Sequence, residues 1–299
     1  MKVLVTGADG FVGRHLVRAL QARGDVVEAC AGPGSAGSLE ITDAAAVLER
    51  IESFTPEGIV HLAGISSVAW SHQHPERTHR VNVGGTANLL DAVRKAAPRA
   101  RVLLVGSGEE YGPLERGVPA METFRLAPLS PYAASKADAE ALGRQAATSH
   151  GLAVVLLRPF NHLGSGQAPQ FVMPSFARQL VAIARGATHP VVQVGDLTPV
   201  RDFSHVDDVI DGYLLLLERG ASGEVYNVCS GQGLSIREAL DVLQELAGTQ
   251  AEIRVDPARL RTAEIPWLVG DPRKLENLGW GRRRLVRDAL RDVLEEAQV

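Results

Sequence analysis

A glycine-rich turn between the first predicted strand and the first predicted helix constrains the fold of this chain more than any other feature. The sequence begins MKVLVTGADGFVG, with Gly7, Gly10 and Gly13 between an apolar run and a helical pattern that ends at Gly24. Glycine allows a tight turn and the close approach of a pyrophosphate, to which the following helix presents free N–H groups. The GxxGxxG spacing alone is weak evidence, but its position between strand and helix predicts a dinucleotide-binding turn.

Apolar runs and helical patterns alternate over the first half of the chain. The runs DVVEACA, GIVHLAG, RVLLVGS and LAVVLLRP are separated by DAAAVLERIES, RTHRVNVGGTANLLDAVRKAA and SPYAASKADAEALGRQAATSHG. Strands that are apolar throughout and alternate with helices indicate a parallel sheet covered on both faces. The sequence therefore predicts an α/β fold with a doubly wound, Rossmann-like parallel sheet.

The alternation stops after Pro159, and the second half predicts a smaller domain. NHLGSGQAPQ is loop-like, FVMPSFARQLVAIARG is helical, and residues 191–220 read as a strand, a loop and a helix. We expect a dinucleotide-binding domain at 1–160, to which 196–228 return, and a C-terminal substrate-binding domain at 161–195 and 229–299. Since no low-complexity linker separates them, we expect the two domains to pack together around a cleft.

The composition excludes several classes of function. The 299 residues are 45% hydrophobic, and their net charge of −4 provides no basic excess for binding nucleic acid. Cys30 and Cys229 are the only cysteines, so we expect no disulfide framework and no metal site. No apolar run approaches the roughly 20 residues of a membrane span, and we expect no signal segment before the first strand. We therefore expect a cytoplasmic protein without a membrane or nucleic-acid partner.

A tyrosine, a lysine and a serine are placed where they can meet. SPYAASK puts Tyr132 one helical turn before Lys136, and VGSGEEYG puts Ser107 at the end of the fourth predicted strand. Open α/β sheets bind ligands at the carboxyl ends of their strands, so these side chains can converge beside a nicotinamide ring. A phenol titrates near pH ~10, and we expect the ammonium and an oxidised nicotinamide to lower the pKa of Tyr132. Such a tyrosine can exchange a proton with a carbonyl oxygen while hydride moves at carbon.

The segment after the second predicted strand leaves the form of the cofactor open. An acidic residue there favours NAD, whereas an arginine receives the 2′-phosphate of NADP. This strand reads DVVEACAGPGS, with Glu28 inside it and only small residues at its end. The predicted cofactor is therefore NAD(P)H in either form.

The motifs TGADGFVG, HLAG, VNVGGT, GSGEEYG and SPYAASK, in this order, resemble the extended short-chain dehydrogenase/reductase (NAD-dependent epimerase/dehydratase) superfamily nearly end to end. The resemblance implies that Tyr132 is the acid/base, that Lys136 binds the nicotinamide ribose and tunes Tyr132, and that Ser107 polarises the substrate carbonyl. It implies a structural role for Asn82, which would hold the central strands together. It also implies a set of cofactor contacts, of which Glu40 stands where aspartate is usual: Gly7, Gly10, Phe11, Val12, Gly13, Glu40, Ile41, Leu62, Ala63, Gly64, Tyr132 and Lys136.

The second half resembles enzymes that act on GDP-6-deoxyhexoses, in RPFNHLGSGQ, FVMPSFARQ, RDFSHVDDV, EVYNVCSG and RLRTAEIPWLVGDPRKLENLGW. In this pattern Arg201 and Arg261 bind the diphosphate, for which guanidinium groups offer bidentate donors, and Glu264 anchors the guanosine or its ribose. The implied substrate contacts are Ser66, Ser107, Glu109, Asn161, Val172, Arg201, Arg261 and Glu264.

Two reactions of these enzymes are compatible with the sequence. GDP-mannose 4,6-dehydratases need an extra acid/base, and Glu109 stands where they have it. However, the chain lacks the Arg- and Ser-rich stretch that accompanies tight NADP retention, and its short loop AGPGSAGS suits cofactor exchange. We therefore predict a reductase that converts the C4 ketone of GDP-4-keto-6-deoxy-D-mannose to GDP-D-rhamnose, with the dehydratase and a nucleotide-sugar epimerase as alternatives. A non-catalytic nucleotide sensor is disfavoured because Tyr132 and Lys136 are both present. Small residues on the helices predicted at 77–97 and 130–151 indicate a homodimer.

Overall fold

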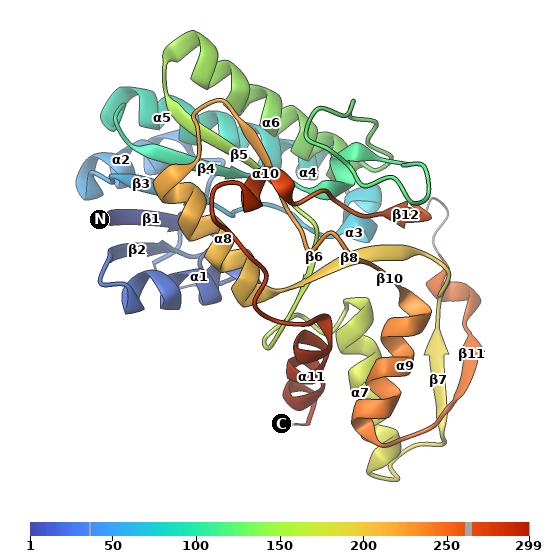
Figure 1. Cartoon of the computed structure of the whole chain (residues 1–299). Coiled ribbons are helices and arrows are strands. Elements are labelled where there is room, and N and C mark those ends of the chain that lie inside the picture. The colour runs from blue at the N-terminus through green and yellow to red at the C-terminus, as the bar shows by residue number, and fades with distance from the viewer. Residues whose placement is uncertain (36, 261–264, 299) are drawn as a thin grey trace.

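A six-stranded parallel sheet forms the centre of the molecule (Figure 1). The computed structural model describes residues 1–35, 37–260 and 265–298. The strand order is β2-β1-β3-β4-β5-β9, and every neighbouring pair is parallel. The predicted doubly wound α/β fold is confirmed. The strands are β1 (Lys2–Thr6), β2 (Val26–Cys30), β3 (Gly58–His61), β4 (Arg101–Val105), β5 (Ala153–Pro159) and β9 (Val225–Val228).

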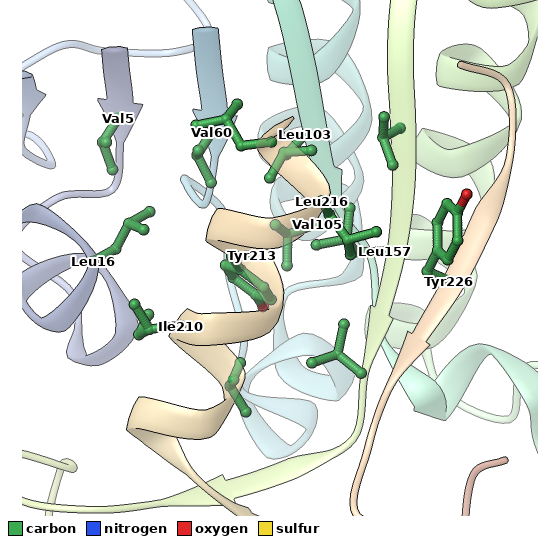
Figure 2. Packing of buried hydrophobic residues seen from close by; sticks show 14 of the residues in the cluster. Val5, Leu16, Val60, Leu103, Val105, Leu157, Ile210, Tyr213, Leu216 and Tyr226 are labelled. Carbon is green, nitrogen blue, oxygen red and sulfur yellow. The ribbon is translucent and has the colours of Figure 1, made fainter. Parts of the chain in front are cut away.

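Helices cover both faces of this sheet because its strands are apolar on both sides. Successive side chains of a strand point to opposite faces, so Val5 packs on one side and Leu4 on the other. Figure 2 shows the first side, where Leu16 and Tyr213 face the strand residues. The helices on that side are α1 (Phe11–Ala22) and α8 (Val206–Arg219). The helices on the other side are α2 (Ala44–Phe54), α5 (Gly85–Ala96) and α6 (Pro131–His150).

The helix predicted at 77–97 starts earlier than expected and contains a π-helical turn. This turn, η1 (Arg80–Gly84), lies between α4 (Pro75–His79) and α5. A short helix, α3 (Val68–Gln73), precedes α4. Single π-turns inside helices often occur at functional sites, and this one contains the buried Asn82.

The second half builds smaller sheets, in which two predictions from the sequence are wrong. The segment 161–170 starts with a strand, β6 (Asn161–Leu163), and the segment 191–220 contains two strands, β7 (Val191–Val194) and β8 (Val200–His205). The sequence of β8, VRDFSH, reads as polar, but the fold buries its Asp202 by giving it partners. The carboxylate of Asp202 accepts hydrogen bonds from the backbone N–H groups of Ser230 and Gly231 at 2.8 and 2.9 Å.

A separate hydrophobic cluster joins the helices of this half that lie in the lower part of Figure 1. β8 pairs with β6, β10 and β12, and β7 pairs with β11. β9 and α8 instead pack with the main sheet, and the domain boundaries given above stay a prediction. The remaining elements are η2 (Gly108–Tyr111), α7 (Val172–Ala184), β10 (Gly233–Ser235), α9 (Ile236–Ala247), β11 (Glu252–Val255), η3 (Pro257–Arg259), β12 (Trp267–Leu268), α10 (Arg273–Glu276) and α11 (Val286–Glu296). Within the described ranges, no helix is both long and apolar enough to cross a membrane.

Candidate active site

The glycine-rich turn is shaped by close backbone contacts. Gly7 has a φ of +68° and accepts a hydrogen bond from the N–H of Gly10 at 3.1 Å. A Cβ at Gly13 would lie 2.2 Å from the carbonyl oxygen of Gly7, and a Cβ at Gly7 would lie 2.8 Å from the nitrogen of Ala63. α1 begins directly after Gly10, which has no side chain to cap it. This cradle, which Cβ atoms would fill, fits the pyrophosphate of a dinucleotide at the N-terminus of α1.

The loop after β3 lies against this turn. The N–H groups of Leu62 and Ala63 donate to the backbone and hydroxyl oxygens of Thr6, at 3.2 and 3.1 Å. Gly64 continues the loop, and a Cβ there would lie 3.6 Å from Nζ of Lys136. The structure therefore brings the cofactor loop predicted after β3 next to the glycine-rich turn and to the predicted lysine.

The other predicted cofactor residues differ in what their side chains offer. The ring of Phe11 stacks on that of His162, with centroids 5.8 Å apart, and Val12 packs against the core of the sheet. Ile41 is buried in the core, so its backbone is the part available to an adenine. Glu40 is exposed, and its carboxylate accepts a 2.7 Å hydrogen bond from the hydroxyl of Thr42.

Ser107, Tyr132 and Lys136 come together at the carboxyl end of β4. Ser107 follows β4 and caps η2, while Tyr132 and Lys136 lie in the first two turns of α6. Ser107 and Tyr132 are 7% and 9% exposed, and the Ser107 hydroxyl lies near enough to the Tyr132 phenol to lower its pKa. Nζ of Lys136 donates to the carbonyl oxygen of Val105 at 2.8 Å. Residues from two separate motifs thus come together at one largely buried polar site.

The protein environment raises the pKa of Tyr132 above its ordinary value. Burial of the phenol is the main cause, and the negative charges of Glu109 and Glu110 act in the same direction, whereas the hydrogen bond with Ser107 lowers the pKa. Burial and the two glutamates thus act against the lowering of the Tyr132 pKa that the sequence predicts from Lys136 and an oxidised nicotinamide. Burial also lowers the pKa of Lys136 to about 8, although the carboxylate of Glu110 raises it.

Asn82 ties the cofactor loop to the helix of Tyr132. Its Oδ1 accepts the N–H of Ile65 at 2.7 Å, and its Nδ2 donates to the carbonyl oxygen of Ile65 at 3.0 Å and to the hydroxyl of Ser135 at 2.9 Å. Ser135 in turn donates to the carbonyl oxygen of Tyr132 at 2.7 Å. Asn82 therefore fixes the distance between α6 and the loop after β3.

A buried charge cluster behind Ser107 was not found by sequence reasoning. Glu110, which follows Ser107 by three residues, accepts the backbone N–H of Ser107 at 2.6 Å. Arg158 of β5 donates two hydrogen bonds of 2.7 Å to Glu140 of α6 and lies 3.6 Å from Oε2 of Glu110. Burial raises the pKa of Glu110 well above its usual value, and the Glu140 carboxylate adds to this, while Arg158 opposes it. The adjacent residues Glu109 and Glu110 are the sequence feature that could have indicated this buried cluster, but adjacent acids usually lie on the surface.

The predicted substrate residues are spread over several elements. Glu109 lies in η2, with its N–H 3.2 Å from Oγ of Ser107, and Ser66 is exposed in the loop after β3. Asn161 begins β6 and is exposed, and Val172 is the first residue of α7. The remaining positions concern the predicted diphosphate and nucleoside contacts.

Arg201 lies in β8, the strand that pairs with β6, and is only 6% exposed. Its guanidinium donates to the carbonyl oxygen of Val200 at 2.9 Å. The other two predicted contacts, Arg261 and Glu264, lie outside the described residues. The structure thus brings Asn161 and Arg201 onto neighbouring strands.

A parallel sheet with a pyrophosphate-sized glycine turn, and a tyrosine–lysine helix beside it, defines a dinucleotide-binding protein of the Rossmann class. The sequence pattern of the NAD dependent epimerase/dehydratase family matches residues 3–229, and the chain belongs to this family. This confirms the family resemblance found in its motifs.

Individual proteins match over nearly the whole chain. GDP-6-deoxy-D-mannose reductase of Pseudomonas aeruginosa is 37% identical over 297 residues, which are 99% of this chain and 96% of the relative. The solved structure of RMD from Pseudomonas aeruginosa complexed with NADPH has a TM-score of 0.90 and 34% identity, covering 99% of this chain and 98% of the other. UDP-glucose 4-epimerase of Thermus thermophilus, in complex with NAD, has a TM-score of 0.88 and 32% identity, covering 99% of both chains.

Proposed function

We propose that this chain reduces the C4 ketone of GDP-4-keto-6-deoxy-D-mannose to GDP-D-rhamnose with NAD(P)H. The observation that carries the proposal is the convergence of the buried Ser107 and Tyr132, with Lys136 on the helix of Tyr132, beside a pyrophosphate cradle. The similarity to GDP-6-deoxy-D-mannose reductase over nearly the full length supports the choice of substrate.

The cofactor supplies the hydride that adds to C4, and the protein residues handle the proton. The hydroxyl of Ser107 donates a hydrogen bond to the ketone oxygen and fixes it beside Tyr132. Tyr132 then gives its phenolic proton to that oxygen as negative charge develops there. Because its pKa is raised, Tyr132 keeps this proton at neutral pH, which is the form that reduction requires.

Lys136 acts on the phenolate that this proton transfer leaves. Its ammonium, held on the carbonyl oxygen of Val105, stabilises the negative charge until a proton from solvent restores the phenol. The turn containing Gly7, Gly10 and Gly13 would hold the cofactor pyrophosphate at the N-terminus of α1. Arg201, Arg261 and the other predicted substrate contacts remain part of the proposal.

One coupled assay tests the reaction. GDP-4-keto-6-deoxy-D-mannose is supplied with NADH or NADPH, the absorbance of the reduced cofactor is followed, and the sugar product is identified. Formation of GDP-D-rhamnose with oxidation of the cofactor is the expected result. Conversion of GDP-mannose to the keto sugar without added cofactor would instead identify a dehydratase that uses Glu109. If neither reaction occurs, the proposed GDP-sugar substrate is wrong.

Replacement of Tyr132 tests the mechanism. We expect Tyr132→Phe to bind the cofactor normally and to lose turnover by about 100- to 10,000-fold, the usual contribution of a positioned acid. Tyr226→Phe is the matched control, because it also removes one tyrosine hydroxyl. That hydroxyl accepts a hydrogen bond from the N–H of Ala221 in the loop before β9 and has no proposed part in the reaction. A Tyr132→Phe variant with near-normal turnover contradicts the mechanism.

We also propose that the chain forms a homodimer through α5 and α6. These helices carry small residues outside the core, among them the exposed Ala87 and Ala141. Small side chains allow helices of two copies to approach closely. Light scattering should give twice the mass of one chain, and Ala141→Arg should give the mass of a single chain.

A further inference from the structure

Asp9 lies in the glycine-rich turn, and its carboxylate reaches the loop that follows β2. Oδ1 accepts a hydrogen bond from the backbone N–H of Gly32 at 2.9 Å, and Oδ2 accepts one from the hydroxyl of Ser35 at 3.3 Å. Since β2 is the edge strand that pairs with β1, the carboxylate lies at the carboxyl end of β2.

This is the position at which a dinucleotide-binding fold distinguishes its two cofactors. NAD has a hydroxyl on the 2′ carbon of the adenosine ribose, whereas NADP has a phosphate there. A carboxylate near the end of the second strand accepts the hydroxyl, and a cation receives the phosphate. In this chain the residues after β2 are Ala31, Gly32, Pro33 and Gly34, so the loop itself offers neither group.

The carboxylate of Asp9 has the space and the capacity to bind a ribose hydroxyl. A Cβ at Gly32 would lie 3.6 Å from Oδ2 of Asp9, and a Cβ at Gly34 would meet no described atom within 4 Å. Gly32, the glycine beside the carboxylate, therefore places no side chain against it. Asp9 is exposed, and a carboxylate offers about four lone-pair sites, of which the two loop contacts use two.

The positive charges close to this loop are engaged in other contacts. The sequence from 31 to 43 contains no lysine or arginine. Arg14 donates to the carbonyl oxygens of Asp9 and Gly166 at 2.6 and 2.9 Å, and Arg50 pairs with Glu28 at 2.7 Å. A 2′-phosphate at this position would therefore meet the negative charge of Asp9, and like charges repel.

We propose that Asp9 makes this chain selective for NADH over NADPH, by accepting a hydrogen bond from the ribose 2′-hydroxyl and repelling a 2′-phosphate. The inference rests on the proposed function, because it assigns the cofactor of the same site. A hydrogen bond to a charged group corresponds to about 10- to 100-fold in affinity. The similar Pseudomonas aeruginosa protein was solved in complex with NADPH, so the proposed preference comes from residues of this chain and not from that relative.

Binding of the two cofactors to the full chain, measured by calorimetry without sugar substrate, tests the inference. We expect NADH to bind about 10- to 100-fold more tightly than NADPH, and Asp9→Asn to reduce this ratio by about tenfold. Ser35→Arg, which adds a cation beside the intact Asp9, should also reduce the ratio, and it keeps the test valid if Asp9→Asn does not fold. Asp91→Asn, which removes an exposed carboxylate on α5, is the matched control and should leave the ratio unchanged.

The outcomes separate this inference from the proposed function. Equal or tighter binding of NADPH by the unmodified chain overturns the selectivity, while reduction of the keto sugar can still be observed. A preference for NADH that Glu40→Gln removes and Asp9→Asn leaves intact assigns selectivity to Glu40 and overturns the role of Asp9. Selective NADH binding without any turnover of the keto sugar leaves the inference standing and refutes the reductase. Failure to bind either dinucleotide refutes both.

Discussion

Replacing Arg158 with methionine tests whether the buried charge cluster behind Ser107 stabilises the fold. Arg158 is 2% exposed and is the cation that both Glu140 and Glu110 face. Oε2 of Glu110 accepts no hydrogen bond from any described residue, so the nearby guanidinium is its main compensation. Methionine keeps much of the buried volume and removes the charge together with the hydrogen bonds to Glu140.

The expected loss is large because two carboxyl groups stay behind. Removing one partner of a buried ion pair costs about 3–5 kcal/mol, and we expect the free energy of unfolding to fall by that amount. Arg144→Met is the matched control, since Arg144 also binds Glu140, at 3.0 Å, but its side chain is 49% exposed. Such an exposed pair contributes about 0–1 kcal/mol.

Urea unfolding followed by circular dichroism measures both variants. The deficit of Arg158→Met should be smaller at mildly acidic than at neutral pH, because the buried Glu110, without its guanidinium partner, binds a proton more strongly in the folded variant than in the unfolded state. The same direction already holds for Glu110 in the unmodified chain, whose pKa burial raises. A loss below about 1 kcal/mol, or one equal to that of Arg144→Met, would refute the reasoning.

Three further predictions concern the site and its supports. Because burial lowers the pKa of Lys136 to about 8, the rate of ketone reduction should fall as the pH rises through that value, and Lys136→Arg should weaken this dependence in a pH–rate profile. Asn82→Ala should lower the free energy of unfolding by about 2–3 kcal/mol in urea, since it leaves its partners on Ile65 and Ser135 unpaired. The control Asn88→Ala, which removes the 3.1 Å hydrogen bond to the carbonyl oxygen of Ile41, should lower stability less. Gly13→Val should abolish cofactor binding in a fluorescence titration, because a Cβ there lies 2.2 Å from the carbonyl oxygen of Gly7; binding at unmodified affinity would contradict the cradle.

The central sheet could be predicted because its strands are apolar on both faces. β1, β3, β4 and β5 are buried at almost every position, and a run of apolar residues records that burial directly. β8 could not be predicted in this way, because Asp202 is buried by hydrogen bonds from residues that follow much later in the chain. The pattern of apolar residues in a sequence does not indicate which distant backbone groups will form hydrogen bonds with a buried carboxylate.

The candidate site shows the same division. Ser107, Tyr132 and Lys136 could be predicted, because each stands at a strand end or a helix start that the sequence itself marks. Glu110 could not, because a carboxylate reads as a surface residue until the fold places Arg158 of β5 beside it. The contact of Asp9 could not be predicted either, since its hydrogen bond with Gly32 depends on the pairing of β1 with β2.

The edge position of β9 has a consequence for how the chain is made. β9 pairs with β5, and α8 covers the apolar side chains on one face of the sheet, yet both elements lie in the second half of the sequence. During synthesis from the N-terminus, β5 is an unpaired edge beside uncovered valine and leucine side chains until residues 206–228 have left the ribosome. Such edges and surfaces promote aggregation of incomplete chains. A nascent chain that stops between β5 and α8 therefore exposes both the unpaired edge of β5 and the apolar face of the sheet. We expect truncation there to yield an insoluble product.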